Sequence, residues 1–247
     1  MGKRERLDRL LVQRGVVASR EEGMRRILAG EVLVNDRPVS KAGSLVDTNA
    51  VIQLKGRSLP YVSRGGLKLE KALDEFRIEV LDKLVLDVGA STGGFTDCLL
   101  ARGAQKVYAV DVGYGQLHWK LRTDPRVFVL ERKNVRYLQA EELPATPQLA
   151  TLDVSFISLR LVLPKIKELL APGGEIVALI KPQFEVGKGK VGKGGVVRSH
   201  EEQLRVVEEI RQAAVAMGLQ VKGVTESPLL GPRGNREFFI YLAKEKI

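Results

Sequence analysis

Two charged residues stand where two apolar segments of the chain end, and both could take part in acid–base or charge-stabilising chemistry. Asp153 follows Leu149–Leu152, and Lys181 follows Glu175–Ile180. Either residue alone is explained equally well as a turn residue that meets solvent. If the two segments are strands of one parallel sheet, their carboxyl ends meet at the edge where such sheets bind ligands. A carboxylate and an ammonium group placed there could orient a substrate hydroxyl, remove its proton or stabilise its developing negative charge.

The segment from Leu84 to Gly94, LVLDVGASTGG, is the part of the chain best suited to hold a ligand beside these charges. Its apolar start predicts a buried strand that runs through a glycine turn into a helix. Glycine lets the backbone approach a ligand closely, and the free N–H groups of the helix start point into the site. A second strand, 106–110, closes with Asp111, which stands 22 residues after Gly89. That spacing is near the ~20 residues at which an acidic residue binds a ribose in dinucleotide folds, so a nucleotide-like ligand is expected.

The loop nevertheless departs from the dinucleotide signature G-x-G-x-x-G, because Ser91 stands at the second glycine. A pyrophosphate there would meet a side chain where backbone is needed. The chain also lacks G-x-x-x-x-G-K-[ST], which excludes a P-loop. A nicotinamide-dependent enzyme therefore remains an alternative that Ser91 disfavours.

Strands and helices alternate over residues 65–247, which predicts an α/β domain with a parallel sheet covered on both faces. Strands are expected at 84–88, 106–111, 127–130, 149–153, 175–181, 219–225 and 237–243. Helices are expected at 67–77, 94–102, 116–122, 159–170 and 200–217. The last two strands follow one another without a helix between them, so the final strand should be antiparallel.

Residues 1–59 predict a separate, basic α+β unit, and residues 60–64, with Pro60, predict a linker. Apolar residues at helical spacing in 7–13, a capping box of Ser19 and Glu22, and an apolar hairpin over 32–39 support this unit. It holds 12 Lys or Arg against 7 Asp or Glu, and the whole chain 40 against 30, a net charge of +10. Such a balance favours a polyanionic partner, although a run of charge on one helix is more often a solvated face.

Several classes of protein are disfavoured by what the 247 residues lack. Cys98 is the single cysteine, so the chain has no internal disulfide, and its apolar helix predicts a packed thiol. His118 and His200 show no metal-ligand spacing, so no metal site is predicted. No apolar run approaches the ~18 residues of a membrane span, and the N-terminus lacks a signal-peptide core. A cytoplasmic protein without a membrane partner is expected.

The stretch SREEGMRRILAGEVLVNDRPV, residues 19–39, resembles the small αL RNA-binding motif of ribosomal and RNA-modifying proteins. Gly23 departs from the usual alanine of that motif. The resemblance implies that the basic face of its second helix meets RNA phosphates, which give affinity rather than sequence choice. A glycine- and lysine-rich segment, 187–195, is expected to form an RNA-facing lid, with a solvated surface loop as the alternative. The residues predicted to contact RNA are Arg4, Arg20, Arg25, Arg26, Asn35, Arg64, Lys188, Lys190, Lys193 and Arg233.

The loop DVGASTGG resembles the first motif of class I S-adenosylmethionine-dependent methyltransferases. That resemblance implies a Rossmann-like sheet with an antiparallel last strand, in which the loop takes the methionine part of the cofactor. Asp111 would then bind the ribose, and Phe95 and Asn134 would lie near the adenine. The predicted cofactor contacts are Asp87, Gly89, Ala90, Ser91, Thr92, Gly93, Gly94, Phe95, Asp111 and Asn134.

Over essentially its whole length the chain is similar to the TlyA family of ribosomal RNA 2′-O-methyltransferases, some of which are called haemolysins. The αL motif, SRGGLKL, DVGASTGGFTD, LDVSFISL and IKPQFE carry this resemblance. It implies S-adenosylmethionine as cofactor and ribosomal RNA or a ribosomal subunit as partner. The related RrmJ/FtsJ-like enzymes use a Lys-Asp-Lys-Glu set, which matches Lys68, Asp153, Lys181 and Glu237. The alternatives are a non-catalytic ribosome-binding or assembly factor and a pore-forming haemolysin.

That set suits methylation of a ribose hydroxyl, a poor nucleophile that must lose its proton as it attacks. A free lysine has a pKa of about 10.4, so a base role needs burial or a second ammonium nearby to lower it. Lys181 is therefore expected to be the base or the oxyanion stabiliser. Lys68 would lower the pKa of Lys181 or steer the ribose, and Asp153 and Glu237 would orient the lysines and the hydroxyl.

Overall fold

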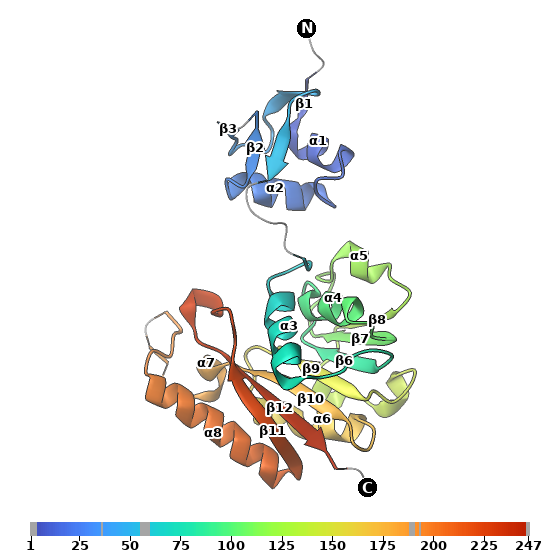
Figure 1. The fold of residues 1–247 in the computed structure, drawn as a ribbon, viewed down its shortest axis with the longest axis vertical. Coiled ribbons are helices and arrows are strands. Elements are labelled where there is room, and N and C mark those ends of the chain that lie inside the picture. The colour runs from blue at the N-terminus through green and yellow to red at the C-terminus, as the bar shows by residue number, and fades with distance from the viewer. Residues whose placement is uncertain (1–3, 36, 55–59, 188–190, 193, 246–247) are drawn as a thin grey trace. The chain divides into compact units, whose positions relative to one another are not determined.

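The computed structural model describes residues 4–35, 37–54, 60–187, 191–192 and 194–245, and it divides the chain into two compact units (Figure 1). Unit 1 is Met1–Leu59 and unit 2 is Pro60–Ile247. The residues expected to link the units, 60–64, pack onto unit 2. Tyr61 is buried there, and its hydroxyl donates a 2.6 Å hydrogen bond to Glu70.

Unit 1 is a small α+β fold, as predicted. Its elements are β1 (Arg4–Arg6), α1 (Leu7–Gln13), α2 (Arg20–Leu28), β2 (Val32–Val34), β3 (Arg37–Pro38), β4 (Leu45–Asp47) and β5 (Ile52–Leu54). β2 pairs with β3 in the predicted hairpin and also with β5, all antiparallel. Ser19 caps α2 by accepting from the N–H of Glu22 at 3.2 Å, and the Glu22 carboxylate reaches back to the N–H of Ala18 at 2.9 Å. The β1–β4 pair was not predicted, because three-residue strands carry too little periodicity.

Unit 2 is built on a seven-stranded sheet in the order β11-β12-β10-β9-β6-β7-β8. The five strands from β10 to β8 are parallel, and β12 runs antiparallel to both β10 and β11. This confirms the mostly parallel sheet and its antiparallel last strand. The strands are β6 (Leu84–Val88), β7 (Lys106–Asp111), β8 (Val127–Glu131), β9 (Leu149–Leu152), β10 (Glu175–Ile180), β11 (Leu219–Glu226) and β12 (Phe238–Lys244).

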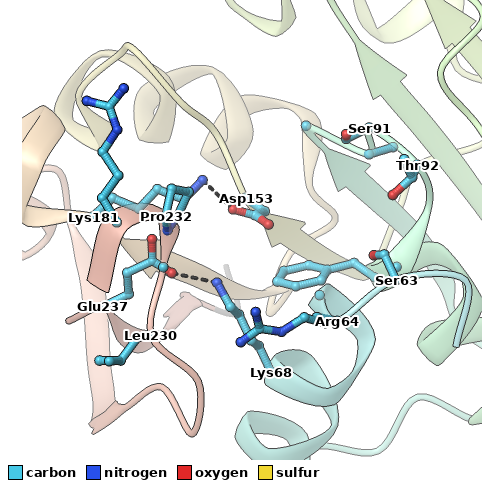
Figure 2. Close-up of a pocket in the computed structure, with 17 residues that line it drawn as sticks. Ser63, Arg64, Lys68, Ser91, Thr92, Asp153, Lys181, Leu230, Pro232 and Glu237 are labelled. Atoms are coloured by element: carbon cyan, nitrogen blue, oxygen red, sulfur yellow. Dashed lines mark hydrogen bonds and ion pairs between the residues drawn. The ribbon is translucent and has the colours of Figure 1, made fainter. Parts of the chain in front are cut away.

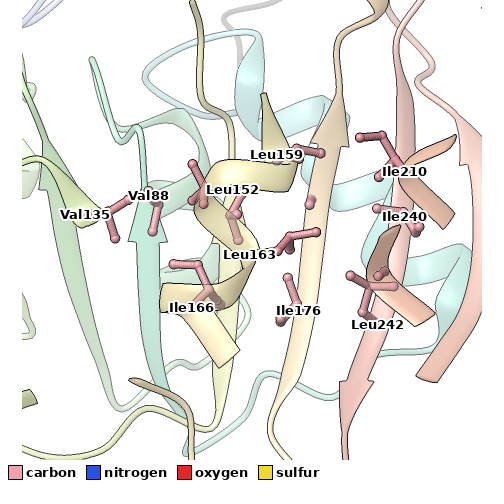
Figure 3. Close-up of a cluster of buried hydrophobic side chains, with 14 of the residues drawn as sticks. Val88, Val135, Leu152, Leu159, Leu163, Ile166, Ile176, Ile210, Ile240 and Leu242 are labelled. Carbon is pink, nitrogen blue, oxygen red and sulfur yellow. The ribbon is translucent and has the colours of Figure 1, made fainter. Parts of the chain in front are cut away.

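Helices cover both faces of this sheet, because its central strands are apolar on both sides. They are α3 (Gly65–Phe76), α4 (Gly94–Ala101), α5 (Trp119–Arg122), α6 (Leu159–Leu169), α7 (Pro182–Glu185) and α8 (His200–Ala216), with short 3-10 turns η1 (Val135–Tyr137), η2 (Ala140–Glu142) and η3 (Pro232–Gly234). On one face, Leu163 of α6 and Ile210 of α8 pack against Leu152, Ile176 and Ile240 of the sheet (Figure 3). On the other face, residues of α3 and α4 form a second core.

Three local differences from the predicted elements bear on the site. β9 and β10 stop at residues 152 and 180, so Asp153 and Lys181 lie just beyond their strands. α7 was not predicted and begins with Pro182 at its first position, directly after Lys181. The helix expected at 116–122 is only Trp119–Arg122, because the His118 side chain caps it by accepting from the N–H of Lys120 at 3.2 Å.

Candidate active site

The turn after β6 brings the backbone of the glycine loop against the end of β9. Gly89 has a φ of +81°, and a Cβ there would lie 2.6 Å from the carbonyl oxygen of Asp153. Only glycine meets both conditions. The loop therefore sits beside the residue that follows β9. Two cavities, which we call the lysine cavity and the Asp111 cavity, meet at this point and share Gly89, Ser91 and Asp153 as lining residues.

The lysine cavity, of about 420 Å³, brings together the four residues of the predicted catalytic set (Figure 2). Lys68 comes from the first turn of α3, and Glu237 immediately precedes β12. The Nζ of Lys68 lies 2.6 Å from Oε2 of Glu237. The Nζ of Lys181 lies 2.5 Å from Oδ1 of Asp153. The first pair joins residues that are 169 positions apart in the chain.

Burial strengthens the electrostatic interactions between these side chains. Lys68 and Lys181 are each 9% exposed and Glu237 is 1% exposed, whereas Asp153 is half-buried. Charges that water does not screen interact strongly. Oε1 of Glu237 accepts no hydrogen bond from the part of the chain that the structure describes, although it is buried. This free acceptor on a cavity wall is suited to a hydroxyl that enters from outside.

Two neighbours of the set were not predicted. The hydroxyl of Ser155 accepts a 2.9 Å hydrogen bond from Nζ of Lys181, which gives that ammonium a second fixed partner. Phe156 follows with a φ of +63°, unusual for an aromatic residue, and its ring is 91% exposed beside Phe184. A non-glycine residue held at positive φ often marks a functional site. Sequence patterns carry no signal for such a conformation, so the positive φ of Phe156 could be found only in the structure.

The Asp111 cavity, of about 540 Å³, combines apolar walls with the carboxylate of Asp111 and with Asp153, which it shares with the lysine cavity. Asp111 accepts from the N–H of Ser91 at 2.8 Å and from the N–H of Gly113 at 2.7 Å, so its carboxylate is held at the cavity edge. Asn134 lines the cavity from the start of η1. The apolar lining consists of Val88, Val110, Val112, Val135, Val154, Phe156, Ile157 and Val162. An apolar slot with a fixed carboxylate is the kind of site that can hold an adenosine group.

Six of the ten predicted cofactor residues do not line the Asp111 cavity, and four of these, Ala90, Thr92, Gly94 and Phe95, line the lysine cavity instead. Asp87 and Gly93 are not among the described residues that line either cavity. The Asp87 carboxylate is buried behind the loop and accepts from the hydroxyls of Thr96 at 2.6 Å and Thr151 at 2.9 Å. Burial raises the pKa of Asp87 to about 6 despite these bonds. Phe95 lines the lysine cavity rather than the Asp111 cavity, because the first turn of α4 directs its ring toward Phe239, 6.2 Å away.

Arg20 of unit 1, predicted to contact RNA, belongs to a charge cluster centred on Asp8. The Asp8 side chain is buried, and its carboxylate accepts from Nε of Arg6 at 3.0 Å and from Nη2 of Arg20 at 2.8 Å. The hydrogen bond from Arg6, with that from Arg20, holds the pKa of Asp8 far below its usual range. Both guanidinium groups are roughly half exposed, so Asp8 presents them to the surface in fixed positions.

The other predicted RNA contacts are dispersed over both units. Lys188, Lys190 and Lys193 lie outside the described residues. Arg26 is ion-paired with Glu22 at 3.0 Å, and Oδ1 of Asn35 accepts from the N–H of Val51 at 2.9 Å. Arg64 and Arg233 are exposed and line the lysine cavity. Arg4 and Arg25 are exposed on unit 1.

Sheet order, glycine loop and strand-end charges together define unit 2 as a class I methyltransferase. The family model for FtsJ-like methyltransferases matches residues 61–244, and the model for S4 domains matches residues 5–52. The chain belongs to the TlyA family, in which an S4 RNA-binding domain precedes an S-adenosylmethionine-dependent, FtsJ-like methyltransferase domain.

Three similar proteins support this membership. YqxC of Bacillus subtilis, named as a candidate rRNA methyltransferase, is 51% identical over 97% of this chain and 86% of its own length. The 16S/23S rRNA (cytidine-2′-O)-methyltransferase TlyA of Mycobacterium tuberculosis is 47% identical over 98% of this chain and 91% of its own. A solved structure from Streptococcus thermophilus, named as a candidate hemolysin, has a TM-score of 0.77 and 46% identity, covering 99% of this chain and 90% of that one.

Proposed function

We propose that this protein transfers the methyl group of S-adenosylmethionine to the 2′-hydroxyl of a cytidine in ribosomal RNA. The observation that carries the proposal is the pair of lysine–carboxylate contacts in the lysine cavity, next to the Asp111 cavity. The names of the relatives supply the nucleoside and the RNA class. A cytoplasmic location follows from a ribosomal substrate.

The Asp111 cavity is suited to the adenosine part of the cofactor, and Gly89 and Ser91 would lie against its methionine part. When bound, S-adenosylmethionine supplies a methyl group on a sulfonium, which an oxygen nucleophile can attack. The fit can be tested without turnover. Calorimetry should show that Asp111→Ala weakens cofactor binding by about tenfold or more, as loss of a charged hydrogen-bond partner does, and unchanged binding would oppose this assignment.

The lysine cavity would receive the ribose. Oε1 of Glu237 has no partner in the described part of the chain and can accept a hydrogen bond from a ribose hydroxyl. Lys181 would take the proton of the 2′-hydroxyl or, charged and held by Asp153, stabilise the oxygen as negative charge develops. Lys68 would steer the ribose from the opposite side, since Glu237 fixes its ammonium. Preorganised groups of this kind lower the barrier without moving during the reaction.

We assign substrate binding to the basic S4 unit, residues 1–59, and catalysis to residues 65–247, with 60–64 between them. A unit with fixed, exposed guanidinium groups recognises phosphates and RNA shape more readily than base sequence. RNA in a folded or subunit context is therefore the expected substrate.

The decisive experiment supplies methyl-labelled S-adenosylmethionine with small subunits, large subunits or naked rRNA, and maps the labelled nucleotide. We expect 2′-O-methylcytidine with the full chain and none with Lys181→Ala. Lys71→Ala is the matched control, because Lys71 lies on α3 near Lys68 but its side chain is more than half exposed and paired with Glu75. No label in any RNA would refute the proposal.

The same protein preparations distinguish the proposed activity from the two alternative functions, an assembly factor and a haemolysin. If Lys181→Ala supports subunit assembly as well as the natural chain, a non-catalytic assembly factor is favoured. Among the described residues, no helix is long and apolar enough to cross a membrane. Release of dye from liposomes by the pure protein would favour a haemolysin.

A further inference from the structure

We propose that the exposed rings of Trp119 and Tyr114 form a stacking surface for unpaired nucleotides that flank the methylation target. This inference rests on the proposed function, because it takes RNA as the substrate. Trp119 is 71% exposed and Tyr114 is 68% exposed. Large aromatic side chains are usually mostly buried, so two such rings within six positions of each other need an explanation.

The segment that carries the rings, residues 113–122, is held to the rest of unit 2 by hydrogen bonds, an ion pair and a buried side chain. Oε1 of Glu131 accepts both the N–H of Gly115, at 2.9 Å, and the guanidinium of Arg122. Nζ of Lys120 lies 2.9 Å from the buried carboxylate of Asp97 on α4. Leu121 is buried. The rings are therefore presented on a fixed base, which lowers the entropic cost of binding a partner.

The segment lies next to the candidate active site. The N–H of His118 donates to the carbonyl of Thr92 at 3.1 Å, and Thr92 lines the lysine cavity. Gln116 lines the Asp111 cavity. The segment thus borders both cavities, and an RNA chain with its ribose in the lysine cavity would run past it.

The chemistry of the surface favours nucleic acid over an apolar protein partner. The guanidinium carbon of Arg132 lies 4.3 Å from the centre of the Tyr114 ring, so one ring already forms a cation–π pair. Lys120 stands next to Trp119, and the chain as a whole carries a net charge of +10. Rings interleaved with cations are the usual means of binding single-stranded RNA, because every base has a face that can stack.

Trp119 is the one tryptophan in the chain, so its fluorescence reports directly on this surface. The 247-residue chain is titrated with a ten-nucleotide oligocytidylate and with an RNA duplex of the same length at one salt concentration. We expect the single strand to quench the emission and to bind several times more tightly than the duplex. Equal quenching by both, or no quenching by the single strand, would overturn the proposal, because phosphate contacts alone would then account for binding.

Substitutions are assayed with a fluorophore on the RNA, since Trp119→Ala removes the protein signal. Trp119→Ala should weaken binding of the single strand about tenfold, as loss of one stacked base does, and Trp119→Phe should stay within about threefold of the natural chain. Tyr114→Ala should weaken it as well. Phe128→Leu, which removes an exposed ring on edge strand β8, should change little. An unchanged affinity in Trp119→Ala, or an equal loss in Phe128→Leu, would contradict the assignment.

Two further measurements separate this inference from the proposed function. S-adenosylmethionine binding and the melting temperature should be unchanged in Trp119→Ala, and a loss of cofactor affinity would instead assign the ring to the cofactor loop and overturn the proposal. Fluorescence quenching does not depend on methyl transfer. Quenching by a single strand without any rRNA methylation would therefore leave the stacking surface standing and refute the proposed activity alone.

Discussion

A single methyl group added at Gly231 should disable the site by moving Glu237. A Cβ at Gly231 would lie 3.0 Å from Oε2 of Glu237 and still closer to Oε1 and Cδ, whereas ordinary contact begins at 3.4 Å. The backbone of Gly231 has a φ of −71°, which alanine adopts freely, so the substitution acts through this collision alone. The carboxylate would have to shift by roughly 1 Å, which is enough to break its 2.6 Å contact with Lys68.

The expected cost follows from that displacement. A misplacement of about 1 Å in a catalytic group costs roughly 100-fold in rate, or about 2.7 kcal/mol of transition-state stabilisation. We expect kcat of Gly231→Ala to fall by about that factor in single-turnover methyl transfer. Calorimetric affinity for S-adenosylmethionine should stay within about twofold, because Gly231 does not line the Asp111 cavity. Gly187→Ala is the control, since a Cβ at Gly187 would meet no atom of the described residues within 4 Å.

A double-mutant cycle tests whether the effect passes through Glu237. In a Glu237→Ala background, Gly231→Ala should add less than about a threefold loss, because the group it displaces is already gone. Fully additive losses, or a Gly231→Ala variant with near-natural kcat, would refute the reasoning.

Three other predictions concern the charges around the site and in unit 1. Ser155→Ala should lower kcat about fivefold by removing one hydrogen bond of roughly 1 kcal/mol from Lys181, and an unchanged single-turnover rate would show that the bond does not position that ammonium. Burial gives Asp87 a folded pKa of about 6, above the 3.8 of an unfolded chain, so its contribution to stability is full below pH 3.8 and is lost as the pH rises through 6. Urea unfolding should therefore show that the free energy of unfolding of Asp87→Asn, relative to that of the natural chain, rises by about 3 kcal/mol between pH 4 and pH 7. A pH-independent difference would contradict this prediction. Because the pKa of Asp8 is lowered in the folded state, Asp8 contributes to stability above pH 3.8, and this contribution is lost at lower pH. Asp8→Asn should therefore destabilise unit 1 by about 2 kcal/mol at pH 7. The loss should appear as faster hydrogen exchange in unit 1 and should shrink below pH 3.8.

Local patterns were sufficient to predict most of the elements. Apolar runs such as Leu84–Val88 specify central strands, because a strand buried on both faces must be apolar throughout. Side-chain caps are equally local, and Ser19 accepts from the N–H of Glu22, three residues ahead, as the sequence predicted. The glycine loop was recognisable for the same reason, since the conformation at Gly89 is a property of one residue and its neighbours.

The roles of individual polar residues in that loop region were less predictable. Asp87 belongs to the recognised motif, but its carboxylate accepts hydrogen bonds from Thr96 and Thr151, which lie on two other elements. Phe95 follows the same loop, but α4 directs its ring into the lysine cavity rather than the Asp111 cavity. Sequence spacing locates a residue along the chain, whereas the direction of its side chain depends on what packs around it.

The sequence by itself determined the strands of the seven-stranded sheet, the cap at Ser19, the glycine turn and the excess of positive charge in the first unit. Only the tertiary structure decided that Lys68 meets Glu237, 169 residues away, and that Lys181 meets both Asp153 and Ser155. It also decided that Trp119 and Tyr114 stay exposed beside the glycine loop. The reason is that the order of strands in a sheet brings distant segments together, and that order is set by packing of whole elements rather than by any local pattern.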